Sequence, residues 1–435
     1  MSSQTQIFAV TGKPVLHSKS PNMFNAMFGY AYKDAAYVRV AAKDAEQAIF
    51  LFKSLGIKGM NVTAPFKEKI IRYIDVIHDE AKILKSVNTI VNKNGKLHGY
   101  NTDFYGVTQS FEDAGISIKN KTCLVIGAGG AGKSAAYGMH TKGAQVTITN
   151  RTFAKAKKAA RIIGCKAASI ENIQQLVEEH DIIISSLHQH INVVDAAWLR
   201  SSHIIFDANY KGSALLPIAK ERRCTVVSAE DWLLNQAVAA YTLFMGEKPN
   251  KDIMRQGLSV TPLSEKKHTI STIGLMGAGK TSHGKVLAQK LDYVFKDTDD
   301  AIVAQQGMPI TQIFEQQGEA YFRNLEAQEL AQSFSSDNPH VLSCGGGIVV
   351  NEQNRDLLKD NSIVIWLYAS PEAIIKRTDI SKRPLLQVAD PLQKLRELLS
   401  ARKGMYAKTA HIIVSTERKL KGHTTNKIIK ELQAI

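Results

Sequence analysis

The chain is poor in cysteine, in aromatic residues and in long apolar runs, and each shortage excludes a class of protein. Its four cysteines, Cys123, Cys165, Cys224 and Cys344, lack the spacing of a metal site. We therefore expect reduced thiols and a cytoplasmic protein. No run of roughly eighteen apolar residues is present, so no membrane-spanning helix is expected. The polar start of the chain also lacks the basic and apolar regions of a secretory signal.

Acidic residues are outnumbered by basic ones, 40 to 55, which gives a formal net charge of +15. The basic residues are dispersed rather than arranged in a stripe, and aromatic residues make up only 7% of the chain. Nucleic acid is therefore not an expected partner. A positive field of this kind favours small anionic substrates and nucleotides.

Strand-like apolar runs alternate with helical patterns along the chain, which predicts an α/β fold. Two of the runs end in glycine-rich turns, at Gly127 and Gly274. Because one domain rarely needs two phosphate-binding turns, we predict a first domain at 1–262, a linker at 263–268 and a second domain at 269–435. The predicted strands are 122–126, 145–149, 181–185, 203–207, 269–274, 340–343 and 363–367.

The first glycine-rich turn, VIGAGGAG at 125–132, lies between a predicted strand and a helical stretch at 133–142. Its glycines fit the pattern G-x-G-x-x-G, which lets the backbone approach a pyrophosphate at a helix N-terminus. The pattern predicts a dinucleotide site. The candidate cofactor-binding residues are Gly127, Gly129, Gly130, Ala131 and Gly132.

The end of the next strand distinguishes between two dinucleotides. An NAD site usually has an acidic residue there, which binds the ribose 2′-hydroxyl. This chain has Asn150, Arg151 and Thr152 instead. A guanidinium suits a 2′-phosphate, so NADP(H) is the predicted cofactor. The alternative is that Arg151 is only an exposed residue at a strand end.

Four polar motifs precede the dinucleotide turn: GKPVLHSKSP at 12–21, GMNVTAPFK at 59–67, SVNT at 86–89 and GYNTD at 99–103. Any one of them is more typical of a turn or a helix cap than of a ligand site. Together they offer hydroxyls, amides, an amine and a carboxylate, which suit a pocket for a polyhydroxylated acid.

These motifs resemble those of the shikimate dehydrogenase family, and the resemblance covers roughly residues 5–258. It implies that Lys67 and Asp103 are the catalytic pair in the NADPH-dependent reduction of 3-dehydroshikimate to shikimate. A positioned ammonium can donate the proton that the carbonyl oxygen needs. The substrate contacts that it implies are Ser18, Ser20, Thr63, Asn88, Asp103, Tyr210 and Gln236.

The resemblance also implies two lobes in the first domain. A substrate lobe would comprise 1–105 and 236–258, and a Rossmann-type NADP lobe would comprise 106–235. Two stretches depart from the family, SSLH at 185–188 and DWL at 231–233, and both lie near the nicotinamide in that family. These departures bear on cofactor geometry and leave the lysine–aspartate pair intact.

The second glycine-rich turn, GLMGAGKT at 274–281, matches G-x-x-x-x-G-K-[ST] between a strand and a helix. Its backbone N–H groups would surround phosphates, Lys280 would reach the transferring phosphoryl group, and Thr281 would bind Mg²⁺. This pattern is specific, and it predicts ATP as a substrate. The candidate nucleotide-binding residues are Gly274, Gly277, Ala278, Gly279, Lys280 and Thr281.

Further motifs, DTD at 297–299, FRNLE at 322–326, CGGG at 344–347 and RPLL at 383–386, follow in order, with Arg402 and Tyr406 on a late helical stretch. With the phosphate loop they resemble shikimate kinase over 269–420. The resemblance implies a P-loop domain of the nucleoside-monophosphate-kinase type with a movable lid near 379–390.

The roles implied by this second resemblance concern ATP, Mg²⁺ and shikimate. Asp297 would hold Mg²⁺ with Thr281. Asp299 would bind the substrate hydroxyls and accept a proton. Glu326 would orient Arg323. The residues implied to contact shikimate are Asp299, Arg323, Gly346, Gly347 and Arg402; those implied to contact ATP include Lys280, Arg377 on the adenine side and Arg383 of the lid.

Two independent sets of motifs thus agree on one metabolite, which predicts a bifunctional enzyme of the shikimate pathway. One alternative keeps the fold and changes the substrate to quinate for the dehydrogenase or gluconate for the kinase. Another makes the first domain a non-catalytic module that binds NADP or shikimate and regulates an active kinase.

Overall fold

The computed structural model describes residues 5–188, 190–209, 212–260, 263, 268–335, 338–380, 383–417 and 421–435. By its internal contacts the chain forms two compact units: unit 1 comprises Met1–Phe66 and Gln256–Ile435, and unit 2 comprises Lys67–Arg255. Most of the predicted linker, at 264–267, lies outside the described residues. The predicted domain boundaries remain a prediction.

Unit 1 contains a parallel sheet whose strands come from both ends of the chain. The strand order is β14-β15-β13-β16-β17-β2-β1-β3, and every neighbouring pair in this order is parallel. These strands are β1 (Gln6–Gly12), β2 (Ala35–Ala41), β3 (Gly59–Val62), β13 (Thr269–Ile273), β14 (Val294–Asp297), β15 (His340–Ser343), β16 (Ser362–Tyr368) and β17 (Ile412–Ser415).

The N-terminal and C-terminal strands of unit 1 meet where β17 pairs with β2. Ile412, Ile413 and Val414 are in register with the stretch Arg39–Ala41. Helix α16 packs against β16 and also against β2. The helices of unit 1 are α1 (Ser20–Tyr30), α2 (Ala45–Leu55), α11 (Lys280–Leu291), α12 (Thr298–Gln306), α13 (Ile310–Ser333), α14 (Glu352–Asn361), α15 (Pro371–Ile375), α16 (Pro391–Thr409) and α17 (Lys421–Leu432).

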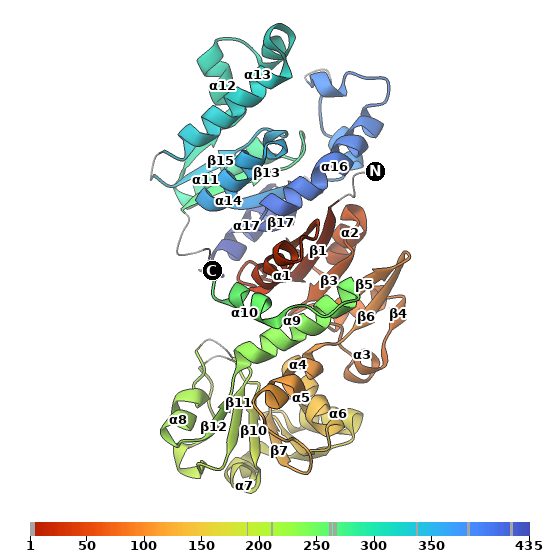
Figure 1. Ribbon diagram of the computed structural model, residues 1–435, viewed down its shortest axis with the longest axis vertical. Helices are drawn as coiled ribbons and strands as arrows, with labels where there is room; N and C mark the ends of the chain where they lie inside the picture. Colours follow the sequence, from red (N-terminus) through yellow and green to blue (C-terminus); the bar gives the residue numbers. More distant parts are fainter. Residues whose placement is uncertain are drawn as a thin grey trace. The chain divides into compact units, whose positions relative to one another are not determined.

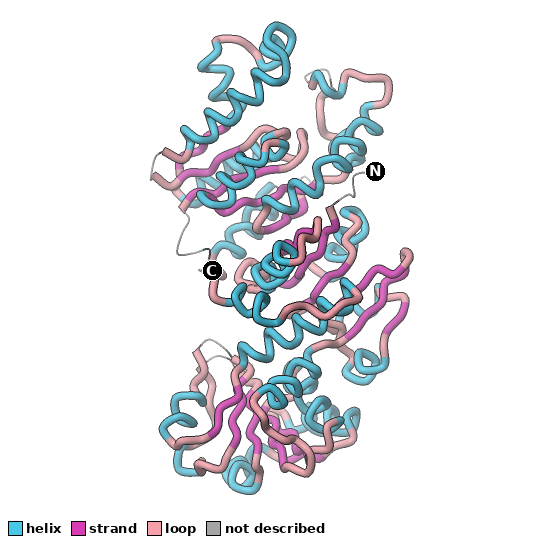
Figure 2. The backbone as a smooth tube through the Cα atoms, viewed as in Figure 1, coloured by secondary structure: helices cyan, strands magenta, loops and turns pink. Residues whose placement is uncertain are grey.

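Unit 2 contains a second parallel sheet with the strand order β12-β11-β10-β7-β8-β9. Its strands are β7 (Thr122–Ile126), β8 (Gln145–Thr149), β9 (Lys166–Ala168), β10 (Ile182–Ser185), β11 (Ile204–Asp207) and β12 (Thr225–Val227). Helices lie on both sides of this sheet in Figures 1 and 2. They are α5 (Gly130–Thr141), α6 (Phe153–Ile163), α7 (Ile173–Glu179) and α8 (Leu215–Glu221).

Alternation of side chains along the strands builds a hydrophobic core on each face of this sheet. Val125 and Ile184 point to one face and pack with residues of α4 (Asp103–Asp113), α5 and α6. Leu124 and Ile183 point to the other face and pack with residues of α7 and α8. The remaining elements of unit 2 are β4 (Val76–Ile77), α3 (Asp79–Leu84), the hairpin β5 (Thr89–Lys93) and β6 (Lys96–Tyr100), and α9 (Ala229–Met245); α10 (Lys251–Leu258) contains the residue at which unit 2 ends.

Local sequence signals fix several helix ends. Asp44 caps α2 by accepting a hydrogen bond from the Gln47 backbone N–H, and Gly56 ends that helix in the left-handed conformation. Asp390 caps α16 in the same way, and Pro391 occupies the first turn, where no N–H is needed.

The predicted α/β class is confirmed, and the predicted strands appear with small shifts at their ends. The runs at 122–126, 145–149 and 340–343 are strands with those bounds. The run at 363–367 is one residue longer at each end. Across the residues that the structure describes, no helix combines the length and the apolar character that a membrane crossing requires.

The pairing of β17 with both β16 and β2 makes a prediction for Ile413→Pro. An interior strand uses every backbone N–H in a ladder, so proline leaves a partner carbonyl unpaired. We expect a loss of roughly 1–3 kcal/mol from that group alone, measured as a lower urea midpoint. Ile413→Val, which keeps the N–H, is the control. Equal midpoints for the two variants would mean that β17 is an edge strand.

Candidate functional site

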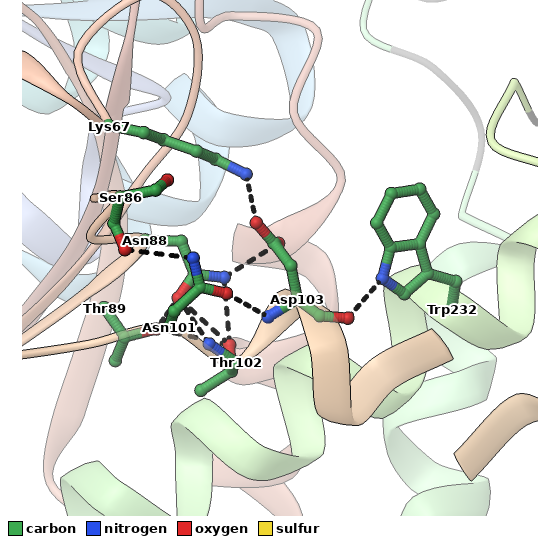
Figure 3. Close-up of polar contacts among 8 residues, drawn as sticks. All are labelled: Lys67, Ser86, Asn88, Thr89, Asn101, Thr102, Asp103 and Trp232. Carbon is green, nitrogen blue, oxygen red and sulfur yellow. Dashed lines mark hydrogen bonds and ion pairs between the residues drawn. The ribbon is translucent and has the colours of Figure 1, made fainter. Parts of the chain in front are cut away.

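Lys67 and Asp103 form a close ion pair in unit 2. The Lys67 Nζ lies 2.6 Å from Asp103 Oδ2, with side-chain exposures of 24% and 2% (Figure 3). Asp103 is the first residue of α4, and a carboxylate so deeply buried requires compensating partners. The Lys67 amine thus pairs with a buried carboxylate, while part of the Lys67 side chain remains accessible to solvent.

A buried amide network holds Asp103 in place (Figure 3). The Asn88 side-chain amide donates to Asp103 Oδ1 at 2.8 Å and to Thr102 Oγ1 at 3.0 Å. The Asn88 side-chain oxygen, Oδ1, accepts from the Thr102 backbone N–H at 2.8 Å. Asn101 accepts from the Asp103 backbone N–H at 3.1 Å and donates to the Ser86 carbonyl at 3.0 Å. Side chains of the predicted motifs therefore fix both the backbone and the carboxylate at the start of α4.

Helix α9 contributes a contact that sequence reasoning missed. The Trp232 indole N–H donates to the Asp103 backbone carbonyl at 2.8 Å (Figure 3). A Cβ on Gly106 would lie 2.9 Å from the Gln236 backbone nitrogen, so α4 and α9 are in close contact. The position of Trp232, four residues before Gln236 on one helix face, is the sequence signal for this contact.

The remaining predicted substrate residues of the first domain lie elsewhere or outside the described residues. Ser18 and Ser20 belong to unit 1, with their hydroxyls 3.3 Å apart at the start of α1. Thr63 follows β3 and is half-buried in the same unit. Tyr210 lies outside the described residues.

The dinucleotide turn of unit 2 has the close packing that its glycines predict. Gly127 follows β7 with φ of 111°, and a Cβ on Gly132 would collide with the Gly127 carbonyl oxygen. The Ser186 hydroxyl, in one of the stretches that depart from the family, donates to the Ile126 carbonyl at 3.1 Å. This serine therefore buttresses the turn. The arrangement leaves the N-terminus of α5 free of a side-chain cap.

The end of β8 presents polar groups beside that turn. The Asn150 side-chain oxygen, Oδ1, accepts from the Ala128 backbone N–H at 3.2 Å. Arg151 and Thr152 are exposed. An exposed guanidinium at this strand end fits a phosphate better than it fits a hydroxyl.

The phosphate loop of unit 1 wraps around the Lys280 amine. Lys280 Nζ donates to the carbonyls of Gly274 at 3.0 Å and Leu275 at 3.1 Å. Burial lowers the pKa of Lys280, and the carboxylates of Asp299 and Asp297 counteract this effect. Gly274, Gly277 and Gly279 all have positive φ, at 142°, 72° and 93°. The glycines thus permit a loop that other residues adopt only with strain.

Oxygen ligands suited to Mg²⁺ gather beside this loop. Thr281 Oγ1 donates to Asp297 Oδ2 at 2.8 Å, and Asp297 caps α12 through the Asp299 backbone N–H at 3.1 Å. Asp299 is partly buried, and desolvation raises its pKa; its Oδ1 is shielded from solvent and has no hydrogen-bond partner. A hydroxyl with a carboxylate fits magnesium. Among the described residues no trio of histidine, cysteine, aspartate and glutamate is placed to bind a metal.

Two cavities meet at this point. The first, of about 770 Å³, contains the phosphate loop with Asp297, Arg377 and Arg383. The second, of about 530 Å³, is lined by Arg323, Gly347 and Arg402. Lining residues common to both are Met276, Asp299, Gly346 and Arg383. The structure therefore brings together the residues that the second resemblance assigned to ATP and to shikimate.

The guanidiniums of the second cavity are held by protein partners. Arg323 pairs with Glu326, as the resemblance implied, and also with Glu319, which sequence reasoning missed. Arg402 donates to the Gly346 carbonyl at 3.2 Å, and the Tyr406 hydroxyl donates to the same oxygen at 2.6 Å. Both arginines are thereby pre-oriented for a carboxylate.

In the first cavity, Arg377 is held by the Gly277 carbonyl at 3.0 Å and the Thr416 carbonyl at 2.7 Å. Arg383 precedes a 3₁₀ turn at Pro384–Leu386. Residues 381–382 of the predicted lid lie outside the described residues.

Comparison with known proteins agrees with both sets of motifs. Residues 10–90 match the family described as shikimate dehydrogenase substrate binding domain, and residues 108–210 match shikimate / quinate 5-dehydrogenase. Residues 276–433 match the family described as shikimate kinase.

Relatives of known name lie in the same families. The NADP(+) shikimate dehydrogenase of Aquifex aeolicus is 35% identical over 57% of this chain and 93% of its own length. The enzyme of the same name from Pyrococcus furiosus is 35% identical over 61% of this chain and 100% of its own. The crystal structure of the Aquifex aeolicus shikimate dehydrogenase aligns with a TM-score of 0.56 at 32% identity, covering 60% of this chain and 100% of that one.

These similarities define an NADP-dependent dehydrogenase joined to a P-loop kinase. The chain belongs to the shikimate dehydrogenase family and carries a shikimate kinase domain in its C-terminal part.

The network around Asp103 predicts the effect of Asn88→Ala. The change leaves the buried Asp103 Oδ1 and the Thr102 backbone N–H without this partner, which costs about 1–3 kcal/mol. Thermal unfolding should show a clearly lower midpoint. Asn92→Ala, in the strand β5 that begins directly after Asn88, removes only an exposed turn contact to the Gly95 N–H and should have little effect. If both variants melt alike, the amide is not supporting the carboxylate.

Proposed function

We propose that the chain is a bifunctional enzyme of the shikimate pathway. Its first part would reduce 3-dehydroshikimate to shikimate with NADPH, and its second would phosphorylate shikimate to shikimate 3-phosphate with ATP. The single observation that carries the proposal is the agreement on one metabolite between two family matches in one chain. Four free cysteines support a cytoplasmic location.

In the reduction, Lys67 is the proton donor. Bound NADPH supplies the hydride. As negative charge builds on the substrate carbonyl oxygen, the Lys67 ammonium donates a proton to it. Asp103 orients that ammonium and stabilises its charge, and Asn88 keeps the carboxylate in place.

The other residues of the reductase bind rather than react. By family resemblance, Ser18, Ser20, Thr63, Tyr210 and Gln236 contact the substrate. Residues 127–132 accept the pyrophosphate, and Arg151 contacts the 2′-phosphate with Asn150 and Thr152. The tight packing of Gly132 on Gly127 supports this assignment, because the third glycine of the pattern lets the helix approach the strand closely.

In the kinase, the lining residues common to the two cavities support a direct transfer from ATP to shikimate. Asp299, which lines both cavities, accepts the proton of the attacking hydroxyl. Lys280 and Arg383 stabilise charge on the phosphoryl group. Arg323 and Arg402 pair with the shikimate carboxylate. Thr281 and Asp297 would hold Mg²⁺, which would neutralise charge on the ATP phosphates.

Lys67→Ala separates the two activities from one side. We expect NADPH oxidation with 3-dehydroshikimate to fall by about 10²–10⁴-fold, the usual contribution of a general acid. Phosphorylation of added shikimate should continue at the wild-type rate. Lys69→Ala, at an exposed lysine two residues away, is the matched control. A normal reduction rate in Lys67→Ala would leave the first part as a binding module.

Lys280→Met should remove the kinase activity and leave the dehydrogenase activity. The substitution keeps the aliphatic stem and removes the charge that faces the phosphates. ATP-dependent phosphorylation should fall by at least ~10²-fold, with NADPH-dependent reduction unaltered. Lys285→Ala, at an exposed position of the same helix, should retain both activities. Kinase turnover that survives Lys280→Met would contradict the assignment of the phosphate loop.

A further inference from the structure

A buried carboxylate near the C-terminus holds the loop that follows β1. Glu431 lies in the last turn of α17 and is 3% exposed. Its Oε2 accepts hydrogen bonds from the backbone N–H groups of Val15 at 2.7 Å and Leu16 at 2.9 Å. Glu431 is more than 400 positions away from Val15 and Leu16 in the sequence, and all three residues belong to unit 1. Two backbone donors that share one carboxyl oxygen hold the loop in a defined direction from Glu431.

A second set of hydrogen bonds holds the same loop at Ser18, three residues after Val15. Arg39 of β2 is buried and donates through Nε and Nη2 to the Ser18 carbonyl, at 3.0 and 2.6 Å. Its Nη1 donates to the carbonyl of His411, directly before β17, at 3.3 Å. Glu431 also attracts the Arg39 guanidinium. The loop is thus fixed at Val15–Leu16 and at Ser18 by contacts that involve the C-terminal part.

The loop held in this way carries two predicted substrate residues. Ser18 and Ser20 follow directly, and the Ser20 backbone N–H donates to Ser18 Oγ at 3.4 Å. The loop lies in the segment 10–90 that matches the dehydrogenase family, whereas Glu431 and His411 lie in the segment 276–433 that matches shikimate kinase. Residues of one enzyme therefore support a loop of the other.

The tie is anchored to a rigid frame. The β17–β2 ladder sets Ile412 opposite Arg39, so the position of His411 follows from backbone pairing. Lys408 pairs with Asp34 at 2.7 Å, and Lys427 donates to Gln47 at 2.9 Å. The first contact joins α16 to the residue before β2, and the second joins α17 to α2.

We propose that Glu431 is a positioning residue of the dehydrogenase. Its carboxylate holds the loop in the conformation that presents Ser18 and Ser20 to 3-dehydroshikimate, so the C-terminal part is needed for full substrate affinity in the reduction. This inference rests on the proposed role of the two serines. Glu431 acts through the backbone of the loop and touches no substrate.

The test measures dehydrogenase kinetics in the full-length chain with Glu431→Leu and Glu431→Gln. Leucine leaves two buried N–H groups without an acceptor, so the loop shifts, and KM for 3-dehydroshikimate should rise about 10- to 100-fold. We expect kcat and the KM for NADPH to change little, because Lys67, Asp103 and the dinucleotide turn are unaltered. Glutamine keeps an acceptor oxygen and should restore most of the affinity.

Glu417→Leu is the matched control. Glu417 accepts from the Ser370 backbone N–H at 2.9 Å and from its hydroxyl at 2.6 Å, a similar tie that does not touch the loop. It should leave KM for 3-dehydroshikimate unchanged. A rise in KM shared by Glu417→Leu and Glu431→Leu, or a loss of kcat without any change in KM, would mean a general structural role and overturn the proposal.

Ser18→Ala separates a failure of the inference from a failure of the proposed function. If Ser18→Ala raises KM for 3-dehydroshikimate and Glu431→Leu does not, the serine assignment holds and the positioning role of Glu431 is wrong. If Ser18→Ala leaves KM unchanged, the assignment of the loop as a substrate loop is wrong, and the inference falls with it. Shikimate phosphorylation at the wild-type rate verifies that each variant is folded.

Discussion

The parallel arrangement of the strands in unit 1 is the constraint on which the rest of that unit depends. Because every neighbouring pair from β14 to β3 is parallel, all of these strands have their carboxyl ends at one edge of the sheet. The phosphate loop follows β13 and Asp297 ends β14 at that edge. The loop with Ser18 follows β1 at the same edge. The β17–β2 ladder therefore aligns loops of both enzymes on one side of a single sheet.

In unit 2, the parallel strands position the dinucleotide turn but not the catalytic carboxylate. Its dinucleotide turn follows β7 as the same rule requires. Asp103, in contrast, begins a helix and is buried at 2% exposure, so its charge needs dedicated partners. Lys67 supplies the opposite charge, and Asn88 supplies a neutral donor. The catalytic pair thus depends on a polar network that must be complete to be stable.

Much of the fold and part of the site could be predicted from the sequence because their signals are local. The apolar run at 122–126 and the glycines of 274–281 specify a strand and a phosphate loop within a few residues. The assignment of Lys67 and Asp103 as a catalytic pair rests on the resemblance and does not follow from their spacing. Their 2.6 Å contact is a fact of the structure.

Long-range pairing could not be predicted. No local pattern says that β17 will pair with a strand more than 370 residues earlier, because either strand would suit an exposed edge equally well. The tie from Glu431 to Val15 depends on that pairing. The contact of the Trp232 indole with the Asp103 carbonyl, which fixes the start of α4, likewise joins residues more than 100 positions apart. Such contacts follow from packing in three dimensions.

The most direct test of two consecutive activities on one metabolite is a single reaction with the purified chain, 3-dehydroshikimate, NADPH, ATP and Mg²⁺, with products identified by mass. The account predicts shikimate 3-phosphate, with one NADPH oxidised and one ADP formed for each molecule. Accumulation of shikimate without phosphorylation would contradict the kinase assignment. An absence of NADPH oxidation, with added shikimate still phosphorylated, would contradict the dehydrogenase assignment.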